Sequence, residues 1–123
     1  MAGRLAATVE RVPVNARQMD DLPALESALA KKPKLVYLCN PNNPCGTMHA
    51  PDDVRRFVSR AAQQATVLVD EAYLDYPDPE LKMSMVPLVR AGQNVIVART
   101  FSKIFGLAGL RMGYAIAAPE MVN

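Results

Sequence analysis

The stretch LVYLCNPNNPCGT, residues 35–47, decides the fold class, because an uninterrupted apolar run passes directly into a cluster of asparagine and proline. A short apolar run between prolines predicts a strand that is buried on both faces, as in a parallel sheet. The polar cluster predicts a loop at the carboxyl end of that strand.

The same arrangement recurs twice further along the chain. TVLVD, residues 66–70, begins the run TVLVDEAY, and NVIVA, residues 94–98, precedes RTFSK. Between these apolar runs, residues 51–62 have helical spacing, and residues 84–91 predict a short helix that ends at Gly92. Alternating strands and helices predict an α/β fold, with parallel central strands joined by right-handed crossovers.

Three further elements flank this unit. Residues 6–14 are rich in Val and Thr and predict a strand, and residues 22–29 predict a helix that Pro33 ends. GYAIAA, residues 113–118, predicts another strand. We find no linker between these elements, so the sequence predicts one domain.

The three polar clusters are expected to face one crevice, because ligands bind at the carboxyl ends of the strands in parallel α/β sheets. Asp70 ends an apolar strand, where a carboxylate favours a cationic partner or a metal. Glu71 should point to the opposite face, which argues against a metal-binding pair. The alternatives are that Asp70 caps a loop and that NPNNPCGT is a tight turn without chemistry.

RTFSK supplies an amine, Lys103, and the hydroxyls of Thr100 and Ser102 at an expected strand-to-helix junction. With Arg111, these hydroxyls predict a phosphate-binding cradle, because guanidinium and hydroxyl groups both donate to phosphate oxygens. The alternative for Lys103 is a solvated surface charge. No metal site is expected, because the spacing of the cysteines and of the histidine matches no common zinc site.

Composition narrows the functional class. Lys and Arg number 14 and Asp and Glu number 12, which leaves a net charge of +2 and disfavours binding to nucleic acid or to an anionic membrane. The apolar runs are shorter than the ~18 residues of a membrane span, and the first residues lack the pattern of a signal peptide. With two cysteines and no export signal, a cytoplasmic location is expected.

NPNNPCGT, VDEAY and RTFSKIFGLAGLRMGY together resemble the fold-type-I aminotransferases of class I and II, most closely the histidinol-phosphate aminotransferase branch. They occur in the order of that family and at about its spacing. The resemblance implies pyridoxal 5'-phosphate as the cofactor. It also implies that the chain is part of the large domain of the aspartate aminotransferase-like fold, a mostly parallel sheet flanked by helices.

The resemblance implies a role for each matching residue. Asn43 and Tyr73 would donate hydrogen bonds to the phenolic oxygen of the cofactor, and Asp70 would keep its pyridine nitrogen protonated. Lys103 would attach the cofactor covalently and act as the base that moves the substrate proton. The remaining residues would bind the phosphate: Thr100, Ser102 and Arg111. Cys45 stands where the family usually has threonine.

The resemblance also implies what lies outside residues 1–123. The N-terminal part of the large domain and the small domain are absent from this chain, Ala2 and Gly3 resemble the end of a family helix, and residues 6–14 would pair with a preceding strand. The complete enzyme would be a homodimer that transfers an amino group from histidinol phosphate or an aromatic amino acid to 2-oxoglutarate. The alternatives are a decarboxylase of the same fold and a non-catalytic fragment. The chain alone is expected to be inactive.

Overall fold

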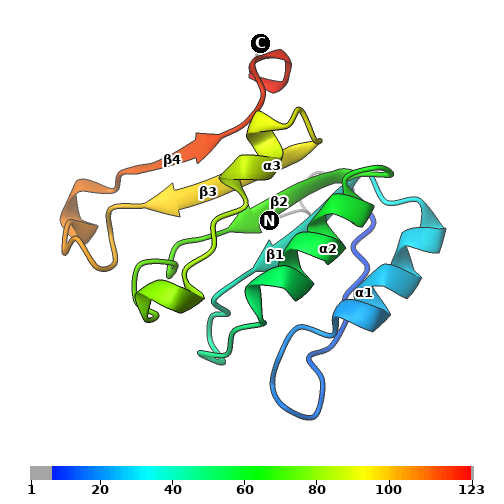
Figure 1. Cartoon of the computed structure of the whole chain (residues 1–123), viewed down its shortest axis with the longest axis horizontal. Coiled ribbons are helices and arrows are strands. Elements are labelled where there is room, and N and C mark those ends of the chain that lie inside the picture. The colour runs from blue at the N-terminus through cyan, green and yellow to red at the C-terminus, as the bar shows by residue number, and fades with distance from the viewer. Residues whose placement is uncertain (1–6, 123) are drawn as a thin grey trace.

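A four-stranded sheet organises the computed structural model, which describes residues 7–122 (Figure 1). Its strands follow one another in chain order: β1 (Leu35–Cys39), β2 (Thr66–Asp70), β3 (Val95–Thr100) and β4 (Gly113–Ile116). The first three are parallel, and β4 pairs with β3 in the antiparallel direction. The predicted α/β class with parallel central strands is therefore confirmed.

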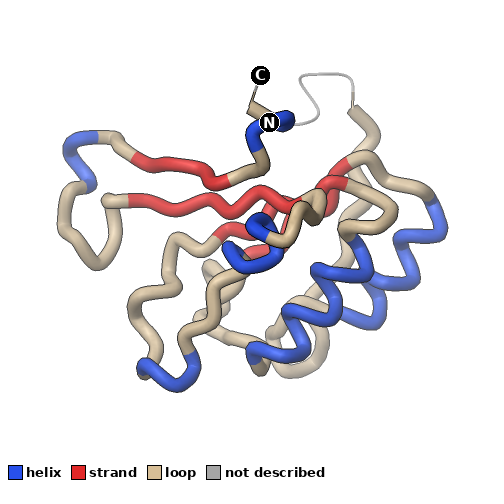
Figure 2. The backbone as a smooth tube through the Cα atoms, turned by 45° about the horizontal axis from the view of Figure 1, so that its top comes forward, coloured by secondary structure: helices blue, strands red, loops and turns tan. Residues whose placement is uncertain are grey.

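Three helices lie on one face of this sheet (Figures 1 and 2). They are α1 (Leu22–Ala28), which a 3-10 turn continues to Lys31, α2 (Pro51–Ala61) and α3 (Val86–Arg90). The Asp21 side chain accepts a hydrogen bond from Ala24 N and caps α1, and Pro51 begins α2, whose first turn is acidic. These starts match the expected first-turn chemistry of helices. Of the described helices, none has the length and apolarity of a membrane-spanning segment.

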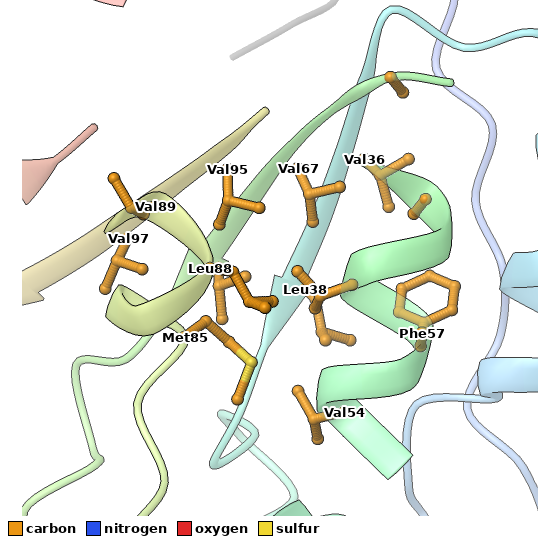
Figure 3. Packing of buried hydrophobic residues seen from close by; sticks show 14 of the residues in the cluster. Val36, Leu38, Val54, Phe57, Val67, Met85, Leu88, Val89, Val95 and Val97 are labelled. Atoms are coloured by element: carbon orange, nitrogen blue, oxygen red, sulfur yellow. The ribbon is translucent and has the colours of Figure 1, made fainter. Parts of the chain in front are cut away.

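The hydrophobic core lies between the sheet and these helices (Figure 3). Alternate strand residues point into it, and α2 and α3 cover them with their apolar faces. The labelled core residues are Val36, Leu38, Val67, Val95 and Val97 from the strands and Val54, Phe57, Met85, Leu88 and Val89 from α2, α3 and the residue before α3. This alternation is typical of a sheet that is covered on one face.

The prediction that the first strand is buried on both faces is wrong for this chain. Leu35 and Tyr37 are 55% and 56% exposed, whereas Val36 and Leu38 on the same strand are buried. The described helices all cover the other face, so these two side chains have no layer above them. We call this uncovered side of β1–β4 the open face.

The strand predicted for residues 6–14 is also wrong, as far as the described residues show. Residues 7–14 form no continuous strand hydrogen bonding with another segment. Their one β-type contact is an isolated bridge between Val14 and Asp20. A strand needs a neighbouring strand to hydrogen-bond with, and the described part of the chain supplies none here. Ala6, Ala2 and Gly3 lie outside the described residues.

Gly113 begins β4 at a close backbone approach. A Cβ atom at this position would lie 2.9 Å from the carbonyl oxygen of Arg99 on β3, which is closer than side chains approach backbone. Glycine therefore allows β4 to turn back directly onto the end of β3, where Thr100 is its partner in the register.

Candidate functional site

The carboxyl ends of the three parallel strands meet at one edge of the sheet. In the register, Cys39 pairs with Asp70, and Asp70 pairs with Ala98. The three polar clusters therefore begin side by side, as predicted. A pocket of about 470 Å³ lies at this edge, and Asn43 and Tyr73, from the first two clusters, both line it.

Asn42 holds the loop of residues 40–47 in shape. Its N–H donates to Thr47 O, its carbonyl accepts from Gly46 N, and its side-chain oxygen accepts from Cys45 N. Gly46 has a φ of +67°, which favours glycine. The peptide bonds before Pro41 and Pro44 are cis. A tight turn thus accounts for Asn42, while its neighbour Asn43 lines the pocket.

Sequence reasoning missed the residue that ties this loop to the rest of the chain. Both carboxylate oxygens of Asp20 accept from Asn42 Nδ2, at 3.2 Å, and the backbone oxygen of Asp20 lies 2.8 Å from His49 Nε2. Burial raises the pKa of Asp20, and the Asn42 hydrogen bond and the nearby His49 oppose that rise. His49 also donates its N–H to Asn40 Oδ1, so its contacts are structural.

Asp70 ends β2 with both carboxylate oxygens hydrogen-bonded. Oδ1 accepts from Ala72 N at 3.0 Å, which is the loop-capping contact that the sequence left open. Oδ2 accepts from the hydroxyl of Tyr37 at 2.9 Å. Burial and, after it, this hydrogen bond to Asp70 raise the pKa of Tyr37. No role for Tyr37 could be predicted, because the contact joins residues 33 positions apart.

Glu71 points to the opposite face, as predicted, but the sequence did not reveal what it binds there. Its side chain is 1% exposed and forms an ion pair with Arg99, whose Nε and Nη2 lie 3.0 and 2.9 Å from Oε2. Oε1 accepts from Met85 N, and Ser84 Oγ donates to both oxygens. One feature of the sequence could have indicated that Glu71 is buried. It continues the alternation of Val67 and Val69, which are buried.

Lys103 lies over the ring of Tyr73, with Nζ 4.9 Å from the ring centroid. The Tyr73 phenol raises the pKa of Lys103, and the positive charge of Arg111 opposes this rise. The Lys103 side chain is exposed to solvent. Tyr73 thus joins two of the predicted residues, because it shares a pocket with Asn43 and a cation–ring contact with Lys103.

The predicted phosphate ligands lie at the end of β3, which is Thr100, and on the connection from β3 to β4. Thr100 Oγ1 donates to Met112 O and accepts from Ser102 N, and Arg111 Nη1 donates to Ala108 O. The bond from Thr100 to Met112 joins the two ends of the connection, and the other two bonds are local. The strand-to-helix junction expected here is wrong, because residues 101–112 contain only a 3-10 turn, Ala108–Leu110, before β4. The chain has to reverse toward an antiparallel strand, and Gly106, with φ +68°, lies in that reversal.

A larger pocket of about 720 Å³ lies elsewhere, between residues 15–23 and α2. None of the seven predicted site residues, all of them described, lines it. Its charged residues are mostly paired: Arg60 with Glu26, and Arg56 with Asp53. The strand-end edge therefore remains the candidate site.

Comparison with known proteins agrees with this geometry. Residues 4–123 match the family described as aminotransferase class I and II. Over 116 residues, 94% of the chain, the sequence is 45% identical to an aromatic amino acid aminotransferase of Mycolicibacterium vanbaalenii. The match covers 33% of that protein, so the chain spans about a third of its relative's length.

Two solved structures extend the comparison. Histidinol-phosphate aminotransferase from Sinorhizobium meliloti, determined in complex with pyridoxal-5'-phosphate, superposes with a TM-score of 0.82 and 34% identity, over 92% of this chain and 30% of that one. A decarboxylase from Sulfurospirillum multivorans gives a TM-score of 0.77 and 29% identity, over 89% of this chain and 30% of that one.

Proposed function

The chain belongs to the class I and II aminotransferases, and from this membership we propose that it is part of a pyridoxal-phosphate-dependent aminotransferase. Residues 1–123 would be a portion of the large, cofactor-binding domain. The observation that carries the proposal is one cluster: Lys103 lies over Tyr73, and Tyr73 shares a pocket with Asn43 at the edge where Asp70 ends β2.

The chemistry of this donor set fits pyridoxal phosphate. Asp70 would pair with the ring nitrogen, and Asn43 and Tyr73 would donate to the phenolic oxygen. Lys103 has an exposed amine for covalent attachment. Lys103 and Arg111 are both exposed cations on the chain segment that follows β3, and a phosphate group accepts hydrogen bonds from either kind of side chain.

When bound, the cofactor withdraws electrons from Cα of the amino donor, which weakens the Cα–H bond. In our proposal Asp70 keeps the ring nitrogen protonated, and Lys103 Nζ takes and returns the proton at Cα. Ser102, Thr100 and Arg111 hold the phosphate. The hydroxyl of Thr100 and the guanidinium of Arg111 now donate to carbonyl oxygens, so each would have to share or exchange that bond.

For the substrates we propose an aromatic amino acid or histidinol phosphate as amino donor and 2-oxoglutarate as acceptor. The names of the similar proteins support both donors. We also propose that the complete enzyme is a homodimer and lies in the cytoplasm. The second candidate function is decarboxylation, which the likeness to the Sulfurospirillum protein favours.

Lys103 is the residue that tests the cofactor assignment. The chain is incubated with pyridoxal phosphate, reduced with borohydride and digested, and the modified lysine is located by mass spectrometry. We expect the reduced adduct on Lys103, and we expect Lys103→Arg to abolish it. Equal or greater modification of Lys34 or Lys82 would show that Lys103 has no special reactivity and would remove the basis of the proposal.

A second prediction concerns turnover. We expect the 123-residue chain alone not to transfer amino groups at the ~1–1000 per second common for enzymes. The measurement is a coupled assay for glutamate formed from 2-oxoglutarate, with histidinol phosphate or phenylalanine as donor. Carbon dioxide release from phenylalanine is recorded in parallel, because it would favour the decarboxylase. Amino transfer at enzymatic rates would instead show that a chain spanning about a third of its relative's length suffices for the reaction.

A further inference from the structure

Tyr37 places a phenol beside Asp70 on the open face of the sheet. In the register of β1 and β2, Tyr37 pairs with Leu68 and Cys39 pairs with Asp70, so Tyr37 and Asp70 lie two positions apart on the same face. Tyr37 is 56% exposed, yet its hydroxyl donates a hydrogen bond to Asp70 Oδ2 at 2.9 Å. The contact therefore depends on the sheet register and not on burial of the ring.

The two hydrogen bonds to Asp70 orient its carboxylate and leave some of its acceptor sites free. Ala72 N holds Oδ1 and the Tyr37 hydroxyl holds Oδ2, so each oxygen has one donor. An ionised carboxylate offers about four acceptor sites, which leaves capacity for another donor. With both oxygens held, the plane of the carboxylate is restrained while its charge stays available.

We propose that Tyr37 is a positioning residue that orients the Asp70 carboxylate toward the pyridine nitrogen of the cofactor. This inference rests on the proposed function, because it presupposes that Asp70 binds that nitrogen. A hydrogen bond donated to a carboxylate stabilises the ionised form, which is the form that pairs with a protonated ring. Removing the hydroxyl should therefore weaken recognition of the nitrogen and leave recognition of the phosphate and the aldehyde unchanged.

The test compares two probes that differ in one ring atom. One is pyridoxal phosphate, and the other is its analogue with a carbon in place of the pyridine nitrogen. Apparent dissociation constants for the 123-residue chain are measured by absorbance titration. We expect Tyr37→Phe to bind pyridoxal phosphate about fivefold more weakly, the effect of one net hydrogen bond, and to bind the analogue like the unchanged chain.

Two control variants make the outcome interpretable. Tyr114→Phe removes a hydroxyl from β4, which is two strands away from Asp70 in the sheet, and should change neither constant. Asp70→Asn should weaken pyridoxal phosphate at least as much as Tyr37→Phe. In the same samples, NMR of the tyrosine Cζ carbons should show the Tyr37 resonance moving in Asp70→Asn, which reports the hydrogen bond without any cofactor.

The possible failures are distinguishable. If Asp70→Asn discriminates between the probes and Tyr37→Phe does not, the inference is overturned and the proposed function stands. If neither variant discriminates, or if the unchanged chain binds neither probe, the role of Asp70 fails and the inference fails with it. Equal weakening of both probes by Tyr37→Phe would indicate a structural role only and would also overturn the inference.

Discussion

Replacing Glu71 with alanine should lower the free energy of unfolding of the chain by about 3 kcal/mol. Breaking a buried ion pair by removing one partner costs about 3–5 kcal/mol, because the remaining charge loses its counter-ion. We expect a cost at the lower end of this range, because the Arg99 side chain keeps 24% of its surface exposed and water can reach it. The loss also leaves Met85 N without the carboxylate oxygen that it donates to.

The measurement is urea denaturation followed by circular dichroism. Asp70→Ala is the matched control, because it removes a neighbouring carboxylate from the open face and should cost only about 2 kcal/mol, the net value of its two hydrogen bonds. Combining Glu71→Ala with Arg99→Met should cost about 1–3 kcal/mol less than the sum of the single changes, since no unpaired charge then remains. Additive costs would show that the pair contributes nothing as a pair.

Leu38→Ala should also destabilise the chain strongly, by about 2–5 kcal/mol. Leu38 is 1% exposed and lies between the sheet and α2, so truncation removes buried methyl groups and leaves a cavity. Leu35→Ala is the matched control on the same strand, because Leu35 lies on the open face and is 55% exposed. Its cost should stay within about 0.5 kcal/mol.

This pair of variants tests whether the sheet is covered on one face only. The same denaturation measurement applies to both. Similar losses for Leu35→Ala and Leu38→Ala would mean that the open face is covered in solution, for instance by a second copy of the chain. The dependence of the unfolding midpoint on protein concentration would then identify self-association as the cause.

Much of the fold could be predicted from local patterns. The apolar runs at 35–40, 66–70 and 94–98 became strands, because short runs of Val, Leu and Ile between turn residues favour strands and these three have one another as partners. Asp21 and Pro51 stand at the starts of two helices for equally local reasons. Residues 6–14 show the limit of such patterns, because a strand also needs a partner, and Val and Thr do not indicate whether one is present.

Only some residues of the candidate site could likewise be predicted from local patterns. Asn43, Tyr73, Asp70 and Lys103 were predicted to lie near one another, since each ends or follows a strand of the parallel sheet and the strand ends have to meet at one edge. Asp20, Tyr37 and the Glu71–Arg99 pair were not predicted. Their partners are 22 to 33 residues away along the chain, and no periodicity in the sequence indicates which distant side chains will meet.

The sequence by itself thus determined most of the strands and helices, residues 6–14 and 101–112 excepted, and which reactive side chains lie at the strand ends, because both follow from short-range spacing. Only the tertiary structure decided the partners of those side chains. The register of β1 against β2 brought Tyr37 to Asp70, and the alternation of β2 sent Glu71 inward to Arg99. Register is a relation between two segments, and a shift of one residue would turn every side chain of a strand to the other face.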